Sequence, residues 1–325
     1  MTQSDPVVSV VMPVYNDQDH LERAVNSVLA QTFDRWELLI VDDGSTDQSV
    51  AIAHAFAARD PRIRVIEADH GGAAHARNIG TKHARGEWIA VLDSDDYAHE
   101  CRLERQLAFA GAHPTAGLVG SYASRVSAAG RPLGIRRGGP ETIEEYRRAR
   151  DAGEVIYIIH SSWLVRRDLM EQVGGYPEDH LLGEDLALMT VRLAPVTDMI
   201  VDPQPLVYRE INPNSLTHRA PRPVVGATEV VMLNLRRRSQ GLPELSYADA
   251  SAELLAQVSW WGRWRYYRHE HGLRLLRLGN ANLADGHLRG VVPLIGAAAF
   301  CPEWLPLIAT WLVRHIRGTE IGSAG

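Results

Sequence analysis

Short apolar runs alternate along the first third of the chain with segments in which apolar residues recur every three or four positions. The first run, residues 7–15, is almost continuously apolar and β-rich, which is typical of a strand covered on both faces. Strands are accordingly predicted at 7–15, 36–41, 63–68 and 88–92, and helices at 21–29, 46–59 and 72–84. This order indicates parallel strands with helices on both faces of the sheet, and such sheets bind ligands at the carboxyl ends of their strands.

The remainder of the chain has a less regular pattern. Helices are predicted at 99–112, 141–151 and 184–193, a strand at 117–124, a β-rich stretch at 155–165 and a basic, glycine-rich loop at 131–139. From about Pro221 the pattern becomes largely helical, with proline and glycine breaks. We therefore place a domain boundary there, between an α/β domain at 1–220 and a helical region at 221–325.

Composition narrows the function classes. The 325 residues are 45% hydrophobic and 23% charged, which is ordinary for a soluble globular protein, and the net charge of −6 argues against nucleic acid as a partner. The two cysteines, Cys101 and Cys301, lack the spacing of a metal site or a disulfide framework. No secretory signal is visible, and no apolar run reaches the roughly 18–20 residues of a spanning helix. A cytoplasmic protein is therefore expected.

Aromatic and basic side chains recur together at helical spacing in the C-terminal region. The aromatic residues are Trp260, Trp261, Trp264 and Tyr267. Such a helix can pack on the α/β domain while its arginines reach water, or it can lie in the headgroup layer of a lipid bilayer. Peripheral contact of the C-terminal helices with the inner face of the membrane therefore stays open.

Three carboxylates follow the predicted strand at 88–92. Asp93, Asp95 and Asp96 repel one another unless a cation neutralises them. At an extended strand end, positions i and i+2 project to the same side, so Asp93 and Asp95 would face one ligand with Ser94 turned away. Mg²⁺ and Mn²⁺ prefer such oxygen ligands together with substrate phosphates. The alternative is an aspartate-rich turn that caps the next helix.

Two further acidic pairs also allow two interpretations. Asp42 and Asp43 follow the strand at 36–41, where a carboxylate can accept hydrogen bonds from a ribose or a base, or can belong to a turn that caps a helix. Glu184 and Asp185 begin a predicted helix, where they either complement the helix dipole or supply a general base.

Four motifs appear in one order along the chain: VVMPVYN at 10–16, VDDGSTD at 41–47, ARNIG at 76–80 and LDSDD at 92–96. Together they closely resemble family 2 glycosyltransferases with the GT-A fold. The resemblance resumes at 159–162 and between 174 and 185, and so covers about the first 220 residues.

This resemblance implies an α/β fold of the GT-A type, with a Rossmann-like, mostly parallel central sheet flanked by helices and a C-terminal helical extension. Residues 1–98 would form a nucleotide-sugar half and residues 99–220 an acceptor half. Pro13, Tyr15 and Asp43 would line the nucleoside pocket, and Arg77 would lie near the base or the diphosphate.

The resemblance also assigns the chemistry. Asp93 would contact the donor and, with Asp95, hold Mn²⁺ or Mg²⁺, Asp95 being the more direct ligand. Asp185 matches the catalytic base, which removes the acceptor's proton while the cation stabilises the leaving diphosphate. Further candidates are His160, Glu184 and His218.

The expected reaction is inverting transfer of one sugar from a nucleoside-diphosphate sugar, UDP-linked in our interpretation, to a sugar or lipid-linked acceptor. The expected setting is bacterial polysaccharide, glycolipid or cell-surface glycan synthesis. The Gln-x-x-Arg-Trp signature of processive members does not occur. Alternatives are a sugar nucleotidyltransferase, which lacks support because no glycine-rich phosphate loop follows the first strand, and a non-catalytic nucleotide-sugar-binding protein.

Overall fold

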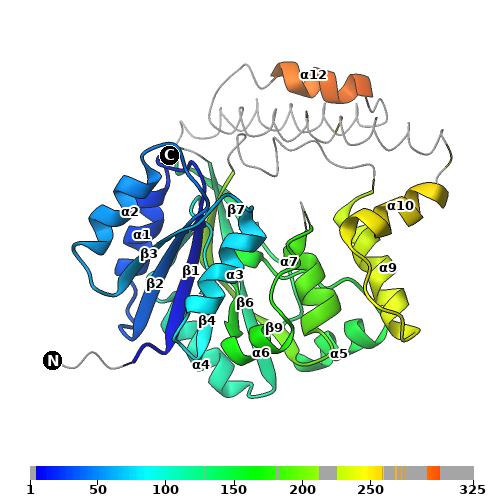
Figure 1. The fold of residues 1–325 in the computed structure, drawn as a ribbon, viewed down its shortest axis with the longest axis horizontal. Helices are drawn as coiled ribbons and strands as arrows, with labels where there is room; N and C mark the ends of the chain where they lie inside the picture. Colours follow the sequence, from blue (N-terminus) through cyan, green and yellow to red (C-terminus); the bar gives the residue numbers. More distant parts are fainter. Residues whose placement is uncertain are drawn as a thin grey trace, which may run out of the picture. The chain divides into compact units, whose positions relative to one another are not determined.

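The computed structural model describes residues 5–127, 129–180, 183–211, 225–257, 259, 268, 272, 275 and 291–300. Its strands are β1 (Val8–Val14), β2 (Trp36–Asp42), β3 (Ile63–Glu67), β4 (Trp88–Val91), β5 (Tyr97–Ala98), β6 (Ala116–Ser127), β7 (Pro132–Arg136), β8 (Leu164–Arg166) and β9 (Asp198–Ile211). Its helices are α1 (Leu21–Leu29), α2 (Ser49–Ala57), α3 (Ala73–His83), α4 (Arg102–Ala112), α5 (Ile143–Asp151), α6 (Arg167–Gln172), α7 (Glu184–Ala187), α9 (Ala227–Ser239), α10 (Tyr247–Gln257) and α12 (Val291–Phe300) (Figure 1). A 3₁₀ turn spans His160–Ser162, and α7 continues as a π-helix over Leu188–Leu193.

The chain divides into two compact units. The first comprises Met1–Val126, Gly134–Glu210 and Ala227–Ser251, and the second comprises Ser127–Leu133, Ile211–Gly226 and Ala252–Gly325. The domain boundary near Pro221 stays a prediction. The first unit includes α9, which follows that position in the sequence. In the second unit, a Cβ on Gly296 of α12 would lie 2.9 Å from Leu275 Cδ1, so the glycine permits this close approach.

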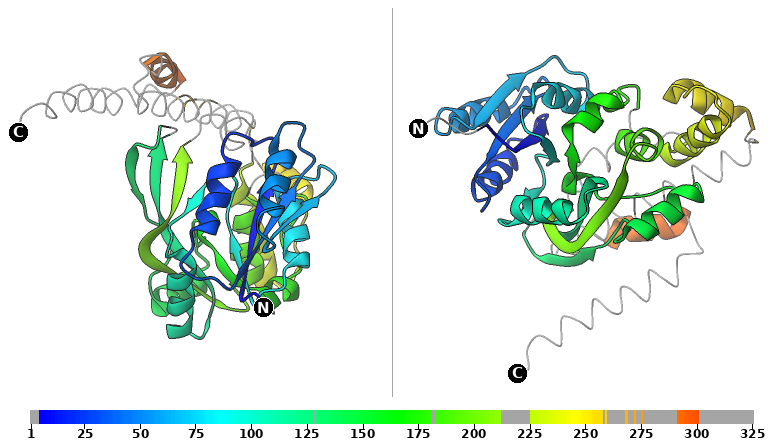
Figure 2. Two further views of the ribbon diagram at one scale, coloured as in Figure 1. Left: turned by 90° about the vertical axis from the view of Figure 1, so that its left-hand side faces the viewer. Right: turned by 90° about the horizontal axis from the view of Figure 1, so that it is seen from below.

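The strands form one nine-stranded sheet with the order β3-β2-β1-β4-β8-β6-β9-β5, and β7 pairs with β6. The pairs β1–β2, β1–β4 and β2–β3 are parallel, as the alternation of strands and helices predicts. The pairs β4–β8, β6–β8 and β5–β9 are antiparallel. The sheet is therefore parallel in its N-terminal part and mixed beyond β4, and it curves between the helices (Figure 2).

Burial explains the continuous apolar character of β1. Alternate residues Val8, Val10, Met12 and Val14 pack in one cluster with side chains of α1 and α2. Val11 belongs to the cluster on the opposite face, to which α3 contributes. Both faces of β1 are covered, so side chains on either face lie in a hydrophobic core. This explains why its sequence is apolar at nearly every position.

Besides the two-residue β5, which was not predicted, two strands differ from the sequence prediction. The segment 131–139 was predicted as a loop, but Pro132–Arg136 forms β7 by pairing with β6. The 14-residue strand β9 was not predicted, because Pro203 and Pro205 interrupt its pattern. Both strands depend on partners distant in sequence, which local patterns do not reveal.

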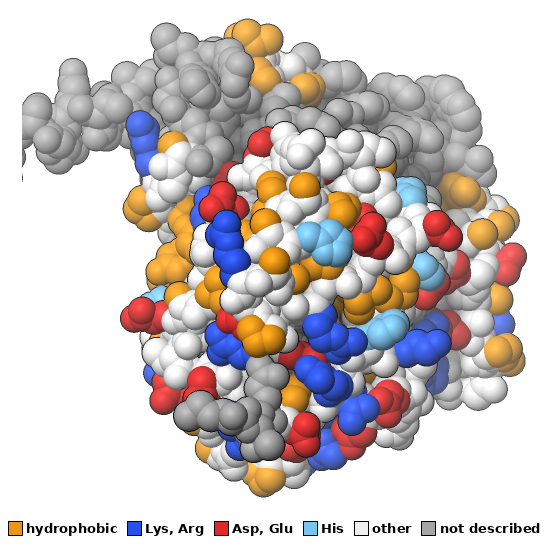
Figure 3. Space-filling view, turned by 60° about the vertical axis from the view of Figure 1, so that its left-hand side comes forward, with side chains coloured by type: hydrophobic (Ala, Val, Ile, Leu, Met, Phe, Trp, Pro, Cys, Tyr) orange, Lys and Arg blue, Asp and Glu red, His pale blue; other side chains and the backbone are white. Residues whose placement is uncertain are grey.

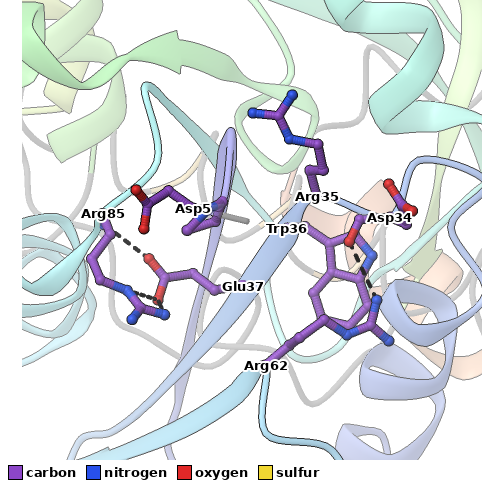
Figure 4. A pocket seen from close by; sticks show the side chains of 8 residues that line it. Asp5, Asp34, Arg35, Trp36, Glu37, Arg62 and Arg85 are labelled. Atoms are coloured by element: carbon purple, nitrogen blue, oxygen red, sulfur yellow. Dashed lines mark hydrogen bonds and ion pairs between the residues drawn. The ribbon is translucent and has the colours of Figure 1, made fainter. Parts of the chain in front are cut away.

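A polar cavity of about 120 Å³ lies at the start of β2, at the end of the sheet opposite to the carboxyl ends of the parallel strands (Figure 4). Two of its charged side chains, Glu37 and Arg85, form an ion pair. Glu37 accepts hydrogen bonds from Arg85 N at 2.8 Å and Arg85 Nε at 2.9 Å, and the Arg62 guanidinium lies 3.8 Å above the Trp36 ring. These contacts stabilise the start of the sheet.

On the face shown in Figure 3, acidic and basic side chains of the described residues are interspersed with small apolar areas. Within the described part of the chain, no helix combines the length and apolar character needed to cross a bilayer.

Candidate active site

The carboxyl ends of β1, β2 and β4 lie at one edge of the sheet because these strands are parallel. The loops that follow β1 and β2 are tied together there. Asn16 Oδ1 accepts a hydrogen bond from Thr46 N at 2.7 Å, and Asn16 N donates to Ser45 Oγ at 2.9 Å. Pro13 is buried within β1, opposite Val41 of β2.

Asp43 connects this edge to the start of α3. Its buried carboxylate accepts hydrogen bonds from Gly71 N at 2.8 Å and Gly72 N at 3.0 Å, and lies 2.9 Å from His70 Nδ1. The Tyr15 ring, 42% exposed, stacks on the His70 ring with 4.3 Å between centroids. Tyr15, His70 and Asp43 thus adjoin at the place where the sequence predicts a nucleoside pocket, and that role stays a prediction.

The three carboxylates after β4 form an acidic cluster, Asp93, Asp95 and Asp96. One oxygen from each lies within 4.8 Å of the others. A turn closed by Asp96 N donating to Asp93 O at 3.1 Å gathers them. Ser94 points away, since its hydroxyl donates to Asp17 Oδ2 at 2.6 Å. Asp93 and Asp95 therefore face one another, but a turn brings them together with Asp96, whereas the i, i+2 expectation assumed an extended strand end.

Two arginines neutralise part of the acidic cluster. Arg77 Nη2 donates to Asp93 at 2.8 Å, and Arg209 Nε donates to Asp96 at 3.3 Å. Among the described residues, no hydrogen-bond or ion-pair partner is recorded for the Asp95 carboxylate. Three carboxylates thus share two guanidinium groups, and among the described residues Asp95 has no counter-charge of its own.

The pKa values reflect this imbalance. Burial, and then the charges of Asp96 and Asp93, raise the pKa of Asp95 well above its usual range. Burial raises the pKa of Asp96 to about 6 despite Arg209. Burial also acts to raise the pKa of Asp93, but Arg77 and other positive groups outweigh it and lower that pKa to about 2. A hard divalent cation fits this donor set, because it would supply the missing positive charge.

Arg77 connects three elements. From α3, its Nη1 donates to Glu184 Oε1 of α7 at 2.7 Å, while its Nη2 reaches Asp93 after β4. The side chain is 8% exposed, and its Nε is buried without a recorded partner. The guanidinium therefore bridges two carboxylates, and the predicted contact of Arg77 with the base or diphosphate stays a prediction.

Asp185 lies beside this bridge in sequence, in the first turn of α7. Its Oδ1 accepts a hydrogen bond from Leu186 N at 2.7 Å. Burial, followed by the charge of Glu184, raises the pKa of Asp185 to about 6. This value suits a general base, since the group is ionised at neutral pH and still binds a proton readily. Gly183 before it has φ +77°, and a Cβ there would lie 2.2 Å from the Ala227 Cβ of α9.

His160 is buried behind the site. Its Nε2 lies 2.8 Å from the Tyr176 hydroxyl, and its ring meets the Trp163 ring edge-on at 4.6 Å. Burial and then the Arg77 charge lower the pKa of His160 to about 3, so the ring is neutral. His218 and the tryptophans at 260, 261 and 264 lie outside the described residues.

The structure thus brings Arg77, Asp93 and Glu184 into one ion-paired group next to Asp95 and Asp96. Sequence reasoning missed the contributions of Asp17, His70, Tyr176 and Arg209. It also missed Ser161, whose hydroxyl donates to Asp96 Oδ2 at 2.5 Å. Asp96 was visible in the motif but received no role. Arg209 had no usable signal, since its partner Asp96 is 113 residues away and its strand was not predicted.

Comparison with known proteins identifies relatives of the chain. The family model described as glycosyl transferase family 2 matches residues 9–174. The uncharacterized glycosyltransferase EpsJ of Bacillus subtilis is 33% identical over 68% of this chain and 65% of its own length. Glycosyltransferase GlyG of Streptococcus pneumoniae is 44% identical over 30% of this chain and 33% of its own length. The matches therefore span less than two thirds of these relatives.

Solved structures share the fold. TarS 1–349 of S. aureus in complex with UDP-GlcNAc superposes with a TM-score of 0.56 at 18% identity, covering 89% of this chain and 88% of that one. The mannosyltransferase PcManGT of Pyrobaculum calidifontis, in complex with GDP-Man and Mn²⁺, gives a TM-score of 0.51 at 18% identity over 96% and 85% of the two chains. These similarities establish a GT-A type of fold.

Proposed function

The chain belongs to glycosyl transferase family 2, and we propose that it transfers a single sugar from a nucleoside-diphosphate sugar to a hydroxyl acceptor with inversion of the anomeric carbon. The observation that carries the proposal is the acidic cluster next to the Arg77–Glu184 bridge that leads to Asp185. Within the cluster, Asp95 has no partner among the described residues. We infer a UDP-linked donor, since the fold neighbour TarS binds UDP-GlcNAc.

Asp95 and Asp93 would hold Mn²⁺ or Mg²⁺ in the cluster. When bound, the cation supplies Lewis-acid stabilisation of the diphosphate that leaves. Tyr15 and Asp43 would hold the nucleoside at the ends of β1 and β2. His70, stacked on Tyr15, is a further surface that the base can meet.

Asp185 would accept the proton of the attacking hydroxyl. Its half-buried carboxylate is ionised at neutral pH, and one base suffices for a direct displacement because the metal-bound diphosphate needs no protonation. Arg77 would keep Glu184, and with it the start of α7, in register with the cluster. The Tyr176–His160 pair, whose Tyr176 ring lies 5.7 Å from the Arg77 guanidinium, would support this bridge from behind.

The test compares ligand binding with turnover. UDP and UDP-GlcNAc are titrated by thermal shift with and without Mn²⁺, and donor hydrolysis is followed by UDP release. We expect the wild type to be stabilised only when nucleotide and cation are both present. Asp95→Ala should lose this stabilisation, whereas Asp185→Asn should keep it and lose turnover.

Each other result has a definite meaning. Binding by the wild type without any turnover would favour a nucleotide-sugar-binding protein. Pyrophosphate release from UTP and a sugar phosphate would favour a nucleotidyltransferase. Wild-type turnover in Asp185→Asn would remove Asp185 as the base.

The proposed setting is bacterial polysaccharide, glycolipid or cell-surface glycan synthesis in the cytoplasm or at the inner face of the membrane. It is supported by the relative TuaG of Bacillus subtilis, whose name assigns it to teichuronic acid biosynthesis and which is 44% identical over 34% of this chain. The sugar or lipid-linked acceptor is part of this proposal.

A further inference from the structure

Arginines gather on three neighbouring strands next to the acidic cluster. Arg125 lies on β6, Arg136 on β7 and Arg209 on β9, and the sheet places β6 between the other two strands. The Arg136 guanidinium lies 5.1 Å from the centre of the Tyr157 ring. Arg209 also donates to Asp96, so this group of arginines adjoins the proposed cation site.

Arg125 and Arg136 lie on paired strands, and the side chains of both are exposed. Burial lowers the pKa of Arg125, and the positive charges of Arg136 and Arg209 lower it further. No ion pair or hydrogen bond is recorded for the side chains of Arg125 and Arg136 within the described residues. Residues 129–140 contain three arginines and no acidic residue, so neighbouring positions in sequence do not supply a counter-charge either.

Like charges that adjoin without a partner are costly unless an anion is bound between them. Arg125 and Arg136 together offer two positive charges and planar pairs of N–H donors. A phosphate matches both properties, since it presents several oxygens and up to two negative charges, whereas a carboxylate would neutralise only one guanidinium.

We propose that Arg125 and Arg136 bind a phosphate group carried by the acceptor. This inference rests on the proposed glycosyl transfer and names the class of its second substrate. The acceptor is favoured over the donor because the two arginines lie on β6 and β7, whereas the donor loops follow β1, β2 and β4.

Such a phosphate has two sources, a soluble glycosyl phosphate or a lipid-linked sugar, and the experiment treats them separately. N-acetylglucosamine 1-phosphate is titrated by calorimetry into protein saturated with UDP and Mg²⁺, so that the donor site is filled. N-acetylglucosamine without the phosphate is the ligand control. In a second arm, co-sedimentation is measured with phosphatidylcholine vesicles with and without a polyprenyl phosphate.

We expect Arg125→Gln and Arg136→Gln each to weaken binding of the phosphate-bearing probe about tenfold, as loss of one partly exposed charge-assisted hydrogen bond implies. The affinity for UDP should stay at the wild-type value. The matched control is Arg166→Gln, which removes the same charge from an exposed arginine paired with Asp168. It should leave all affinities unchanged.

Equal affinity of the wild type and both variants for each phosphate probe would overturn the proposal. An equal loss in Arg166→Gln would also overturn it, because the effect would then reflect net charge. Weaker UDP binding in Arg125→Gln and Arg136→Gln would assign these arginines to the donor instead. The sugar phosphate is also titrated without UDP. If the wild type does not bind UDP, the proposed glycosyl transfer is refuted, and this second titration still tests whether the two arginines bind phosphate.

Discussion

Replacement of Arg77 by methionine should destabilise the protein strongly, because it leaves two carboxylates without their shared counter-charge. The side chains of Arg77, Asp93 and Glu184 are 8%, 24% and 16% exposed. Removal of one partner from a buried ion pair costs about 3–5 kcal/mol. We place Arg77→Met at the lower end, about 3 kcal/mol, because water reaches the Asp93 carboxylate.

The pKa of Asp93 provides a separate estimate of the same quantity. Its lowering from 3.8 to about 2 corresponds to about 2 kcal/mol for this carboxylate alone. Because the folded-state pKa is below the unfolded value, this stabilisation is complete above about pH 4 and is lost as the pH falls through about 2. Measurements at pH 7 therefore record the whole effect.

The assay is urea unfolding at pH 7, followed by tryptophan fluorescence, for the wild type, Arg77→Met and Arg77→Lys. The lysine variant keeps the charge but loses the planar fork, so it should lose less stability than the methionine variant. Mn²⁺ should restore more stability to Arg77→Met than to the wild type, since it neutralises a cluster that has lost one of its two guanidinium groups. The exposed pair Arg166–Asp168 supplies the control Arg166→Met, with a change below about 1 kcal/mol.

A loss below about 1 kcal/mol in Arg77→Met, with an unchanged denaturant slope, would contradict the reasoning. It would show that Asp93 and Glu184 find other partners, and the bridge would then not be what holds α7 beside the cluster.

Three further outcomes are expected. The rate of donor turnover should fall tenfold per pH unit below about pH 6, where the Asp185 base becomes protonated. Glu184→Gln removes a negative neighbour of Asp185 and should therefore move this acidic limb of the pH–rate profile to lower pH. If the limb does not move, it reports the titration of another group. Gly175→Ala should lower the free energy of unfolding in urea by about 1–3 kcal/mol, since φ at this position is +70° and the new Cβ would lie 2.5 Å from Asn78 Oδ1. An unchanged free energy of unfolding would mean that this turn relaxes to accommodate the side chain. Tyr146→Phe should cost about 1–2 kcal/mol, because its buried hydroxyl lies 3.0 Å from Ala194 O and 2.9 Å from Thr197 O, and a melting temperature equal to that of the wild type would contradict this.

The parallel half of the sheet was predictable because its information is local. Strands β1 to β4 are short apolar runs, and the helices between them repeat their apolar residues at helical spacing. The acidic run from Asp93 to Asp96 is likewise visible without tertiary information, although a turn and not an extended strand end gathers its carboxylates. The four ordered motifs indicate the family that the comparisons confirm. β7 and β9 were missed because glycine and proline disturb their pattern and their partners are distant in sequence.

Which charges meet was decided only by the tertiary structure. Arg77 pairs with Glu184 across 107 positions and Arg209 pairs with Asp96 across 113, distances over which no spacing rule operates. The sequence by itself determined the fold family, the acidic turn after β4 and the candidate base. Folding determined that Asp95, alone in the cluster, lacks a partner among the described residues. It also determined that Arg125 and Arg136 lie on paired strands without a counter-charge from those residues. The physical reason is that the electrostatic energy of a side chain depends on its neighbours in space and on its burial.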